Sequence, residues 1–131
     1  MRLVLMLLAV PLLSLAGCSR AADGPTVELK GRTYTVEIAD DFQEQAHGML
    51  FVYEAAERQA YGMRNCHIPL DIMYFDAAGR FINAHYNAPP CNAAQCPSYP
   101  SSAPAKYVLE LGGGVGKALG LAPGDALTLP Q

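Results

Sequence analysis

Turn-forming residues divide this chain into short segments, which limits the folds open to it. The 131 residues include 12 glycines and 10 prolines. Between these residues, several runs alternate apolar with polar side chains in the manner of β-strands. The sequence therefore predicts short elements joined by many turns. Its length suits one domain and not two.

Composition excludes two broad classes of protein. Hydrophobic residues make up 51% of the chain and charged residues only 16%, which excludes a disordered polyelectrolyte. The formal net charge is −3 and the sequence pI is about 5.5. Nucleic-acid binding requires a basic face, so we expect no nucleic-acid partner.

The N-terminus has the pattern of an export signal. Arg2 precedes an apolar run over residues 3–10, which is too short to span a bilayer, since a spanning helix needs about 20 apolar residues. Residues 15–18 read Leu-Ala-Gly-Cys and resemble the bacterial lipobox, in which the cysteine sulfur receives a diacylglycerol. The alternative is an ordinary signal peptide followed by a coincidental cysteine.

The lipobox resemblance predicts both the domain boundaries and the location. Residues 1–17 are expected to form a lipoprotein signal peptide, 18–25 a tether and 26–131 the folded domain, with a lipid on Cys18 as the membrane anchor. Ser19 follows the cysteine, whereas an aspartate there would resemble an inner-membrane retention signal. We therefore expect attachment to the outer membrane, facing the periplasm.

The remaining cysteines are interpreted for an oxidising compartment. Cys91 and Cys96 are separated by four residues within the proline-rich segment 87–105, where pairing is sterically easy, and we predict a disulfide between them. Cys66 is left over and is expected to be a small buried hydrophobe. A C-x4-C spacing with no second pair is poor for structural zinc, so no metal or cofactor is assigned.

The periodicity predicts a mainly β (α+β) fold. A hairpin is expected over 26–30 and 32–39 about Gly31, and residues 54–60 are expected to form a loop or one helical turn. Further strands are expected over 49–53, 61–65, 68–76, 80–86, 106–111 and 126–129, and two short helices over 41–47 and 112–121. About seven short strands avoid exposed edges best as a small antiparallel barrel-like domain.

Several segments resemble one protein family. Residues 49–52 (Met-Leu-Phe-Val), 61–65 (Tyr-Gly-Met-Arg-Asn), 68–71 (Ile-Pro-Leu-Asp) and 107–111 (Tyr-Val-Leu-Glu-Leu) are similar to the signature of the DUF192 (UPF0127) family. The likeness covers roughly residues 26–129 in the expected order. It implies a small, predominantly β, barrel-like domain with short helices. Because the family is functionally uncharacterised, the likeness implies a fold more than an activity.

The chain departs from the family pattern at two places. Residues 47–51 merge two family elements, as if about a dozen residues were missing. Tyr61 and Gly62 stand where the family resembles Phe-Trp, so a large apolar side chain is lost. If that side chain lines a ligand site in the family, the site is altered in this protein.

Four residues form the predicted ligand-binding set. Arg64, Asn65 and Asp71 interrupt apolar strands with groups that can hold a polar ligand, and Tyr99 in the disulfide-closed loop adds an amphipathic ring. The alternative is structural: Arg64 pairs with Asp71, and Asn65 shapes the bend before Pro69.

No motif assigns a catalytic residue. His47, His67 and His85 are far apart in the sequence, no G-x-S-x-G occurs, and the glycines over 112–116 lack the phosphate-loop frame. We therefore expect a non-enzymatic envelope module that binds a small polar ligand, a glycan or an envelope protein. The alternatives are a hydrolase-like periplasmic enzyme with a site assembled by the fold, and a purely structural envelope lipoprotein.

Overall fold

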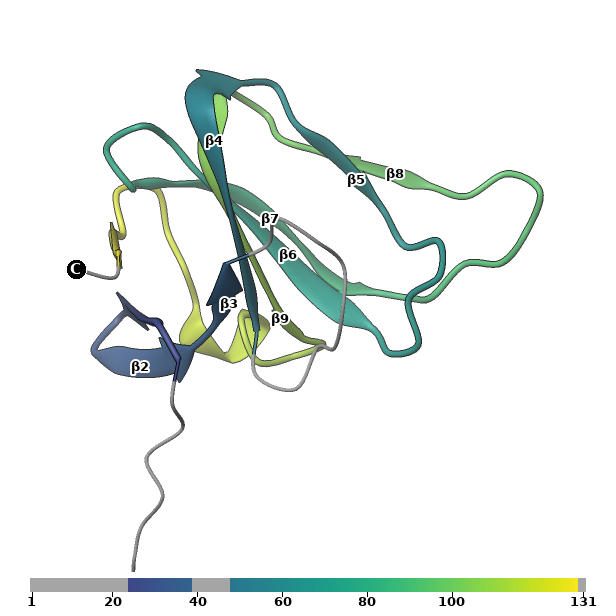
Figure 1. The fold of residues 1–131 in the computed structure, drawn as a ribbon, viewed down its shortest axis with the longest axis horizontal. Helices are drawn as coiled ribbons and strands as arrows, with labels where there is room; N and C mark the ends of the chain where they lie inside the picture. Colours follow the sequence, from purple (N-terminus) through teal and green to yellow (C-terminus); the bar gives the residue numbers. More distant parts are fainter. Residues whose placement is uncertain (1–23, 39–47, 130–131) are drawn as a thin grey trace, which may run out of the picture.

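The computed structural model describes residues 24–38 and 48–129. The predicted signal peptide, Cys18 and the helix expected over 41–47 lie outside these residues. The described part forms ten strands and one 3-10 turn, η1 (Figure 1). Their bounds are β1 Thr26–Leu29, β2 Arg32–Thr35, β3 Glu37–Ile38, β4 Met49–Glu57, β5 Ala60–Gly62, β6 Leu70–Phe75, β7 Phe81–Ala88, β8 Ser98–Pro100, β9 Ala105–Gly112, η1 Lys117–Leu119 and β10 Leu127–Thr128.

The strands form three separate sheets. A central sheet has the order β3-β4-β9-β6-β7, a second has the order β10-β1-β2, and β5 pairs with β8 in a two-stranded ribbon. Every pairing is antiparallel except β3 with β4. The predicted hairpin is confirmed as β1–β2, whose register joins Val27 to Tyr34 and Leu29 to Arg32.

The predicted barrel is wrong, because the sheets do not close on one another. The central sheet ends at β3 on one side and at β7 on the other. Closure would require a ladder between these two strands, yet β3 is only two residues long and pairs with β4. Beyond β4 the chain leaves the central sheet to form the ribbon (Figure 1).

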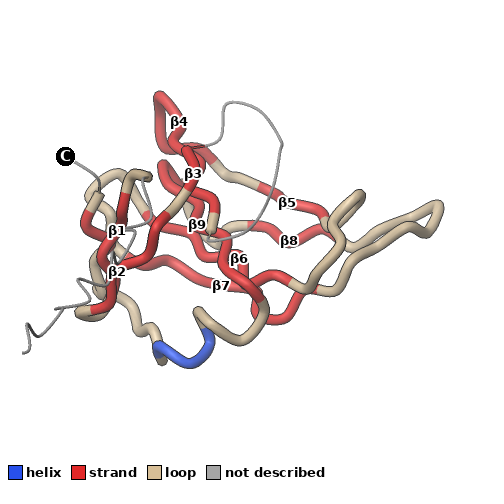
Figure 2. Tube along the Cα trace, turned by 60° about the horizontal axis from the view of Figure 1, so that its bottom comes forward, coloured by secondary structure: helices blue, strands red, loops and turns tan. Residues whose placement is uncertain are grey.

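The helix predicted over 112–121 is also wrong. Its only helical part is the 3-10 turn η1 of three residues. Gly114 has φ +89° and Gly120 has φ +58°, a left-handed backbone that does not continue a helix. Figure 2 shows this turn in a chain otherwise made of strands and loops.

Three other element predictions need correction. The loop expected over 54–60 is largely strand, because β4 continues to Glu57, which pairs with Ala105 of β9. The strand expected over 61–65 ends at Gly62. The proline-rich segment 87–105, in which no strand is predicted, contains the short strand β8.

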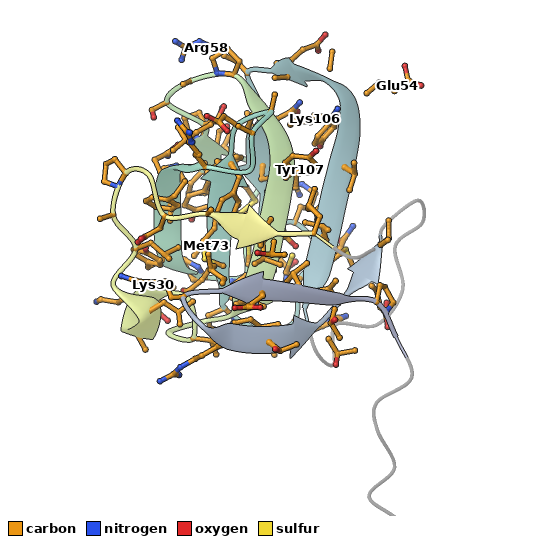
Figure 3. The ribbon with its side chains drawn as sticks, turned by 90° about the vertical axis from the view of Figure 1, so that its left-hand side faces the viewer. Lys30, Glu54, Arg58, Met73, Lys106 and Tyr107 are labelled. Carbon is orange, nitrogen blue, oxygen red and sulfur yellow. A yellow bond between two sulfur atoms is a disulfide. The ribbon has the colours of Figure 1, made fainter. Side chains whose placement is uncertain are left out.

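The central sheet carries a hydrophobic cluster on each face. One face packs against β1, β2 and β10 through side chains that include Leu29, Met73 and Leu109. Figure 3 looks onto this side, with β10 and the β1–β2 hairpin in front of the central sheet that carries Met73 and Tyr107. The other face, called here the ribbon face, packs Ile72, Tyr74 and Val108 among others. No helix of the described residues is long and apolar enough to cross a membrane.

Candidate functional site

The predicted ligand-binding residue Asp71 is fully buried, at 0% exposure, and its carboxylate accepts three backbone hydrogen bonds. Oδ1 accepts from the N–H of Asn87 (2.8 Å) and of Gly114 (3.0 Å), and Oδ2 accepts from the N–H of Lys117 (2.8 Å). Asp71 therefore connects β6, the end of β7 and the turn before η1. This bonding occupies both oxygens in a structural role.

Arg64 and Asn65 lie on the surface, in the turn that follows β5. Arg64 Nη2 donates to the carbonyl oxygens of Ala93 (3.0 Å) and Ala94 (3.3 Å), and Asn65 has φ +61°. The described residues contain one salt bridge, between Lys30 and Asp125. The predicted alternative, an ion pair between Arg64 and Asp71, is therefore not formed. The guanidinium instead holds the loop between Cys91 and Cys96.

The predicted disulfide between Cys91 and Cys96 is confirmed, with Cα atoms 5.8 Å apart. It closes the loop that Arg64 contacts. Cys66 lies outside this disulfide and is partly buried.

Tyr99, the fourth predicted ligand residue, belongs to a group of rings between the ribbon and the central sheet. Tyr99 pairs with Tyr61 across the ribbon. Ring centroids lie 5.4 Å apart for Tyr99 and His85, 5.1 Å for Tyr61 and Phe51, 6.0 Å for Tyr61 and Tyr74, and 6.2 Å for Tyr74 and His85. Each pair is edge-to-face, the arrangement that aromatic rings favour. We call these five residues the ring cluster.

Side-chain hydrogen bonds attach the ribbon to the central sheet. The hydroxyl of Tyr74 donates to the carbonyl of Tyr99, and the Tyr53 and Tyr61 hydroxyls bond to each other. Two side chains of β7 reach the carbonyl oxygen of Pro100: His85 through Nε2 (2.8 Å) and Asn83 through Nδ2 (3.2 Å). The ribbon is thus positioned by side chains from β4, β6 and β7.

Glu110 is the unusual residue of the ribbon face. It pairs with Met49 on one side and with Ile72 on the other, in the middle of the central sheet. Its side chain is on the same face as Val108 because side chains alternate along a strand. Glu110 is only 8% exposed, and no described residue donates a hydrogen bond to it. Burial raises the pKa of Glu110 to about 7.

Two tyrosines of the ring cluster lie within the electrostatic reach of Glu110. Burial is the main cause that raises the pKa of Tyr61, and the hydrogen bond with Tyr53 is the second. The charge of Glu110 raises this pKa further. Burial also raises the pKa of Tyr74, again with a contribution from Glu110. Both hydroxyls therefore stay protonated and can donate hydrogen bonds at neutral pH.

This arrangement offers both donors and acceptors in a shielded setting. A carboxyl with a pKa near 7 exists in protonated and ionised forms at neutral pH, and tyrosine hydroxyls donate and accept. Such a set can bind a ligand rich in hydroxyl groups, and it can also transfer a proton. Among the described residues, no group of three or more His, Cys, Asp or Glu side chains is arranged to hold a metal ion.

Sequence reasoning missed Glu110 and the tyrosines around it. One signal was available. Glu110 is the charged residue within the apolar run 107–111, and a strand buried on both faces leaves such a residue no exposed side. The tyrosines carried no comparable signal, because their meeting depends on the ribbon folding over the sheet.

Comparisons with known proteins agree with this fold. The family described as "Uncharacterized ACR, COG1430" (DUF192) matches residues 25–129. A protein of unknown function from Novosphingobium aromaticivorans DSM 12444 aligns with TM-score 0.64 and 26% identity, over 78% of this chain and 82% of that one. A candidate transcription regulator from Sinorhizobium meliloti 1021 aligns with TM-score 0.62 and 32% identity, over 79% of this chain and 91% of that one.

No curated protein matches this chain. The family match nevertheless spans nearly all the described residues and runs from β1 to β10. It also covers the residues of both the predicted set and the ring cluster. On this match, the chain belongs to the DUF192 family.

Proposed function

We propose that this protein is a lipid-anchored binding module of the bacterial envelope, whose ribbon face binds a small polar ligand rich in hydroxyl groups, such as a glycan fragment. One observation carries the proposal. Glu110 is nearly buried, receives no hydrogen bond from the described residues, and is near enough to Tyr61 and Tyr74 for its charge to raise the pKa of both hydroxyls. Burying a carboxyl without a hydrogen-bond donor costs free energy. Residues with such an unfavourable environment are found most often at functional sites.

The neighbouring hydroxyls supply the groups that the ligand needs. In the hydrogen bond between Tyr53 and Tyr61, one hydroxyl donates and the other accepts, so the accepting tyrosine keeps its own O–H for a ligand. We include Tyr99 in this surface as a ring on which the ligand can stack. Arg64 acts at a distance, by holding the loop between Cys91 and Cys96. Asp71 has a structural role, by joining β6 to β7 and to the turn before η1.

A ligand screen tests the proposal. The full chain, purified in detergent, is screened by thermal shift against cell-wall glycan fragments, simple sugars and short peptides. A ligand that binds the folded state raises the melting temperature. We expect a glycan fragment to raise it in the wild type and in Glu57→Gln, which changes an exposed carboxyl at the end of β4, but not in Glu110→Gln. Equal shifts in all three proteins would contradict the proposal.

The hydrolase-like alternative is favoured by one observation, the pKa of Glu110 near 7, which suits a general acid or base. It also predicts a His–carboxylate pair, and in the described residues His85 Nε2 is instead bonded to the carbonyl of Pro100. Product analysis separates the two functions. If the bound fragment is cleaved by the wild type but only bound by Glu110→Gln, the protein is an enzyme.

The proposed anchor has its own prediction. Cys18→Ser should leave the precursor unprocessed and without lipid, because the acylated sulfur is lost. The measurement is mass spectrometry together with membrane fractionation after expression in a bacterial host. Ser19→Ala is the matched control and should be lipidated as the wild type is. Normal processing and membrane attachment of Cys18→Ser would refute the anchor.

A further inference from the structure

Three cysteines meet at the far end of the ribbon. The loop that joins β5 to β6 carries Cys66, and the loop that joins β7 to β8 carries Cys91 and Cys96. Figures 1 and 2 show these two loops next to each other, away from the β1–β2 hairpin. The sequence predicts separate roles for these cysteines, but the fold places their loops side by side.

A shared backbone acceptor brings Cys66 next to the disulfide. The carbonyl oxygen of Met63 accepts hydrogen bonds from the N–H of Cys66 (3.4 Å) and from the N–H of Cys91 (3.0 Å). Both cysteine side chains also pack against the hydrophobic cluster of the ribbon face. Cys66 retains its thiol, whereas Cys91 is bonded to Cys96.

Arg64 brings a positive charge to the other sulfur of the disulfide. Its Nη2 lies 3.0 Å from the carbonyl oxygen of Ala93, and Cys96 Sγ lies 3.7 Å from the same oxygen. A positive charge in the neighbourhood of a sulfur favours its thiolate form and so makes it a better leaving group. Cys91 is therefore the disulfide cysteine that shares a backbone acceptor with Cys66, and Cys96 is the one whose sulfur shares an acceptor with Arg64.

We propose that Cys66, Cys91 and Cys96 form a thiol–disulfide exchange site. Cys66 loses its proton to water, and its thiolate attacks Cys91 Sγ. The Cys66–Cys91 bond forms as the Cys91–Cys96 bond breaks, and the electron pair leaves on Cys96, which takes up a proton. One disulfide replaces another, so the step needs neither an oxidant nor a reductant.

The exchange would change both the shape and the chemistry of this end of the ribbon. The Cys91–Cys96 ring opens, and the new disulfide ties together the two loops that flank the ribbon. The thiol moves from Cys66 to Cys96, which follows the exposed residues 92–95. There it can attack a disulfide of a second molecule, so the chemical class of substrate is a disulfide.

Peptide mapping of the full chain tests the exchange. Trypsin cleaves after Arg64, Arg80 and Lys106, which places Cys66 in peptide 65–80 and the other two cysteines in peptide 81–106. Purified protein is incubated at pH 7 and pH 8, quenched with acid, alkylated and digested. We expect a growing fraction in which peptide 65–80 is linked to Cys91 and the alkyl label is on Cys96. The initial rate should be higher at pH 8 than at pH 7, because the attacking species is the thiolate.

Two controls make the result specific. Cys66→Ser and Cys66→Ala should show no label on Cys96 under the same conditions, with melting curves recorded to show that each variant is folded. The wild-type rate should not change on tenfold dilution, since the step is intramolecular. Label confined to Cys66 after a day at pH 8, with Cys91–Cys96 as the sole disulfide among these three cysteines, would overturn the proposal. So would linkage that appears only between two molecules.

Discussion

Replacing Asp71 with alanine should lower the free energy of unfolding by about 3 kcal/mol or more, because the N–H groups of Asn87, Gly114 and Lys117 lose their shared acceptor. For a domain of this size, the melting temperature should fall by about 10 °C or more. Urea denaturation and a thermal melt measure the two quantities. No other carboxylate of the described residues accepts three backbone hydrogen bonds.

Two further variants show whether the loss comes from the hydrogen bonds. Asp71→Asn keeps one oxygen but places an amide N–H₂ opposite one of the donors, so its loss should be intermediate. Glu28→Ala, at an exposed position of β1, should change the free energy of unfolding by less than about 0.5 kcal/mol. An Asp71→Ala protein as stable as the Glu28→Ala control would show that Asp71 does not hold these segments together.

The second large effect is the pH dependence caused by Glu110. Its pKa is about 7 in the folded protein against 4.5 in the unfolded chain, so the folded state binds the proton more tightly. The contribution to stability is therefore fully present below pH 4.5 and is lost as the pH rises through 7. A shift of this size corresponds to about 3 kcal/mol. Tyr61 and Tyr74 stay neutral across this range, because their pKa values are raised.

Glu110→Gln should remove this dependence. The variant carries a neutral group at every pH, so it should match the wild type near pH 4.5 and exceed its stability by up to about 3 kcal/mol at pH 8.5. Urea denaturation from pH 4.5 to 8.5 gives the comparison, with Glu57→Gln as the control that retains the wild-type slope. If Glu110→Gln and the wild type lose stability in parallel, another group causes the pH dependence.

Local sequence signals predicted the local structure. Alternation gave the β1–β2 hairpin, and the apolar runs gave the approximate positions of β6, β7 and β9. The Cys91–Cys96 disulfide could also be predicted, because both cysteines lie within one short loop. In each of these cases the determining contacts lie close together along the chain.

The candidate site could not be predicted in the same way, because its contacts join distant segments. The donors to Asp71 are 16, 43 and 46 residues further along the chain, so nothing near Asp71 indicates that its oxygens are occupied. Residues 54–57 have few large apolar side chains, so the sequence does not indicate a strand there. They belong to β4 in the structure, where Glu57 pairs with the distant Ala105 of β9. The glycines over 112–114 do not support the predicted helix, and Asp71 binds the turn that forms instead.

The place of β9 between β4 and β6 has a consequence for how the molecule forms. β9 is the central strand of the five-stranded sheet, and the register joins it to both neighbours along most of its length. A chain that emerges from its N-terminal end therefore presents β4 and β6 with unpaired edges until β9 has been made. Pairing between segments so far apart in sequence is slow, and unpaired strand edges invite association with other chains. The central sheet of this domain can form only after β9, its last long strand, has been made. Before that point the chain is most prone to aggregation.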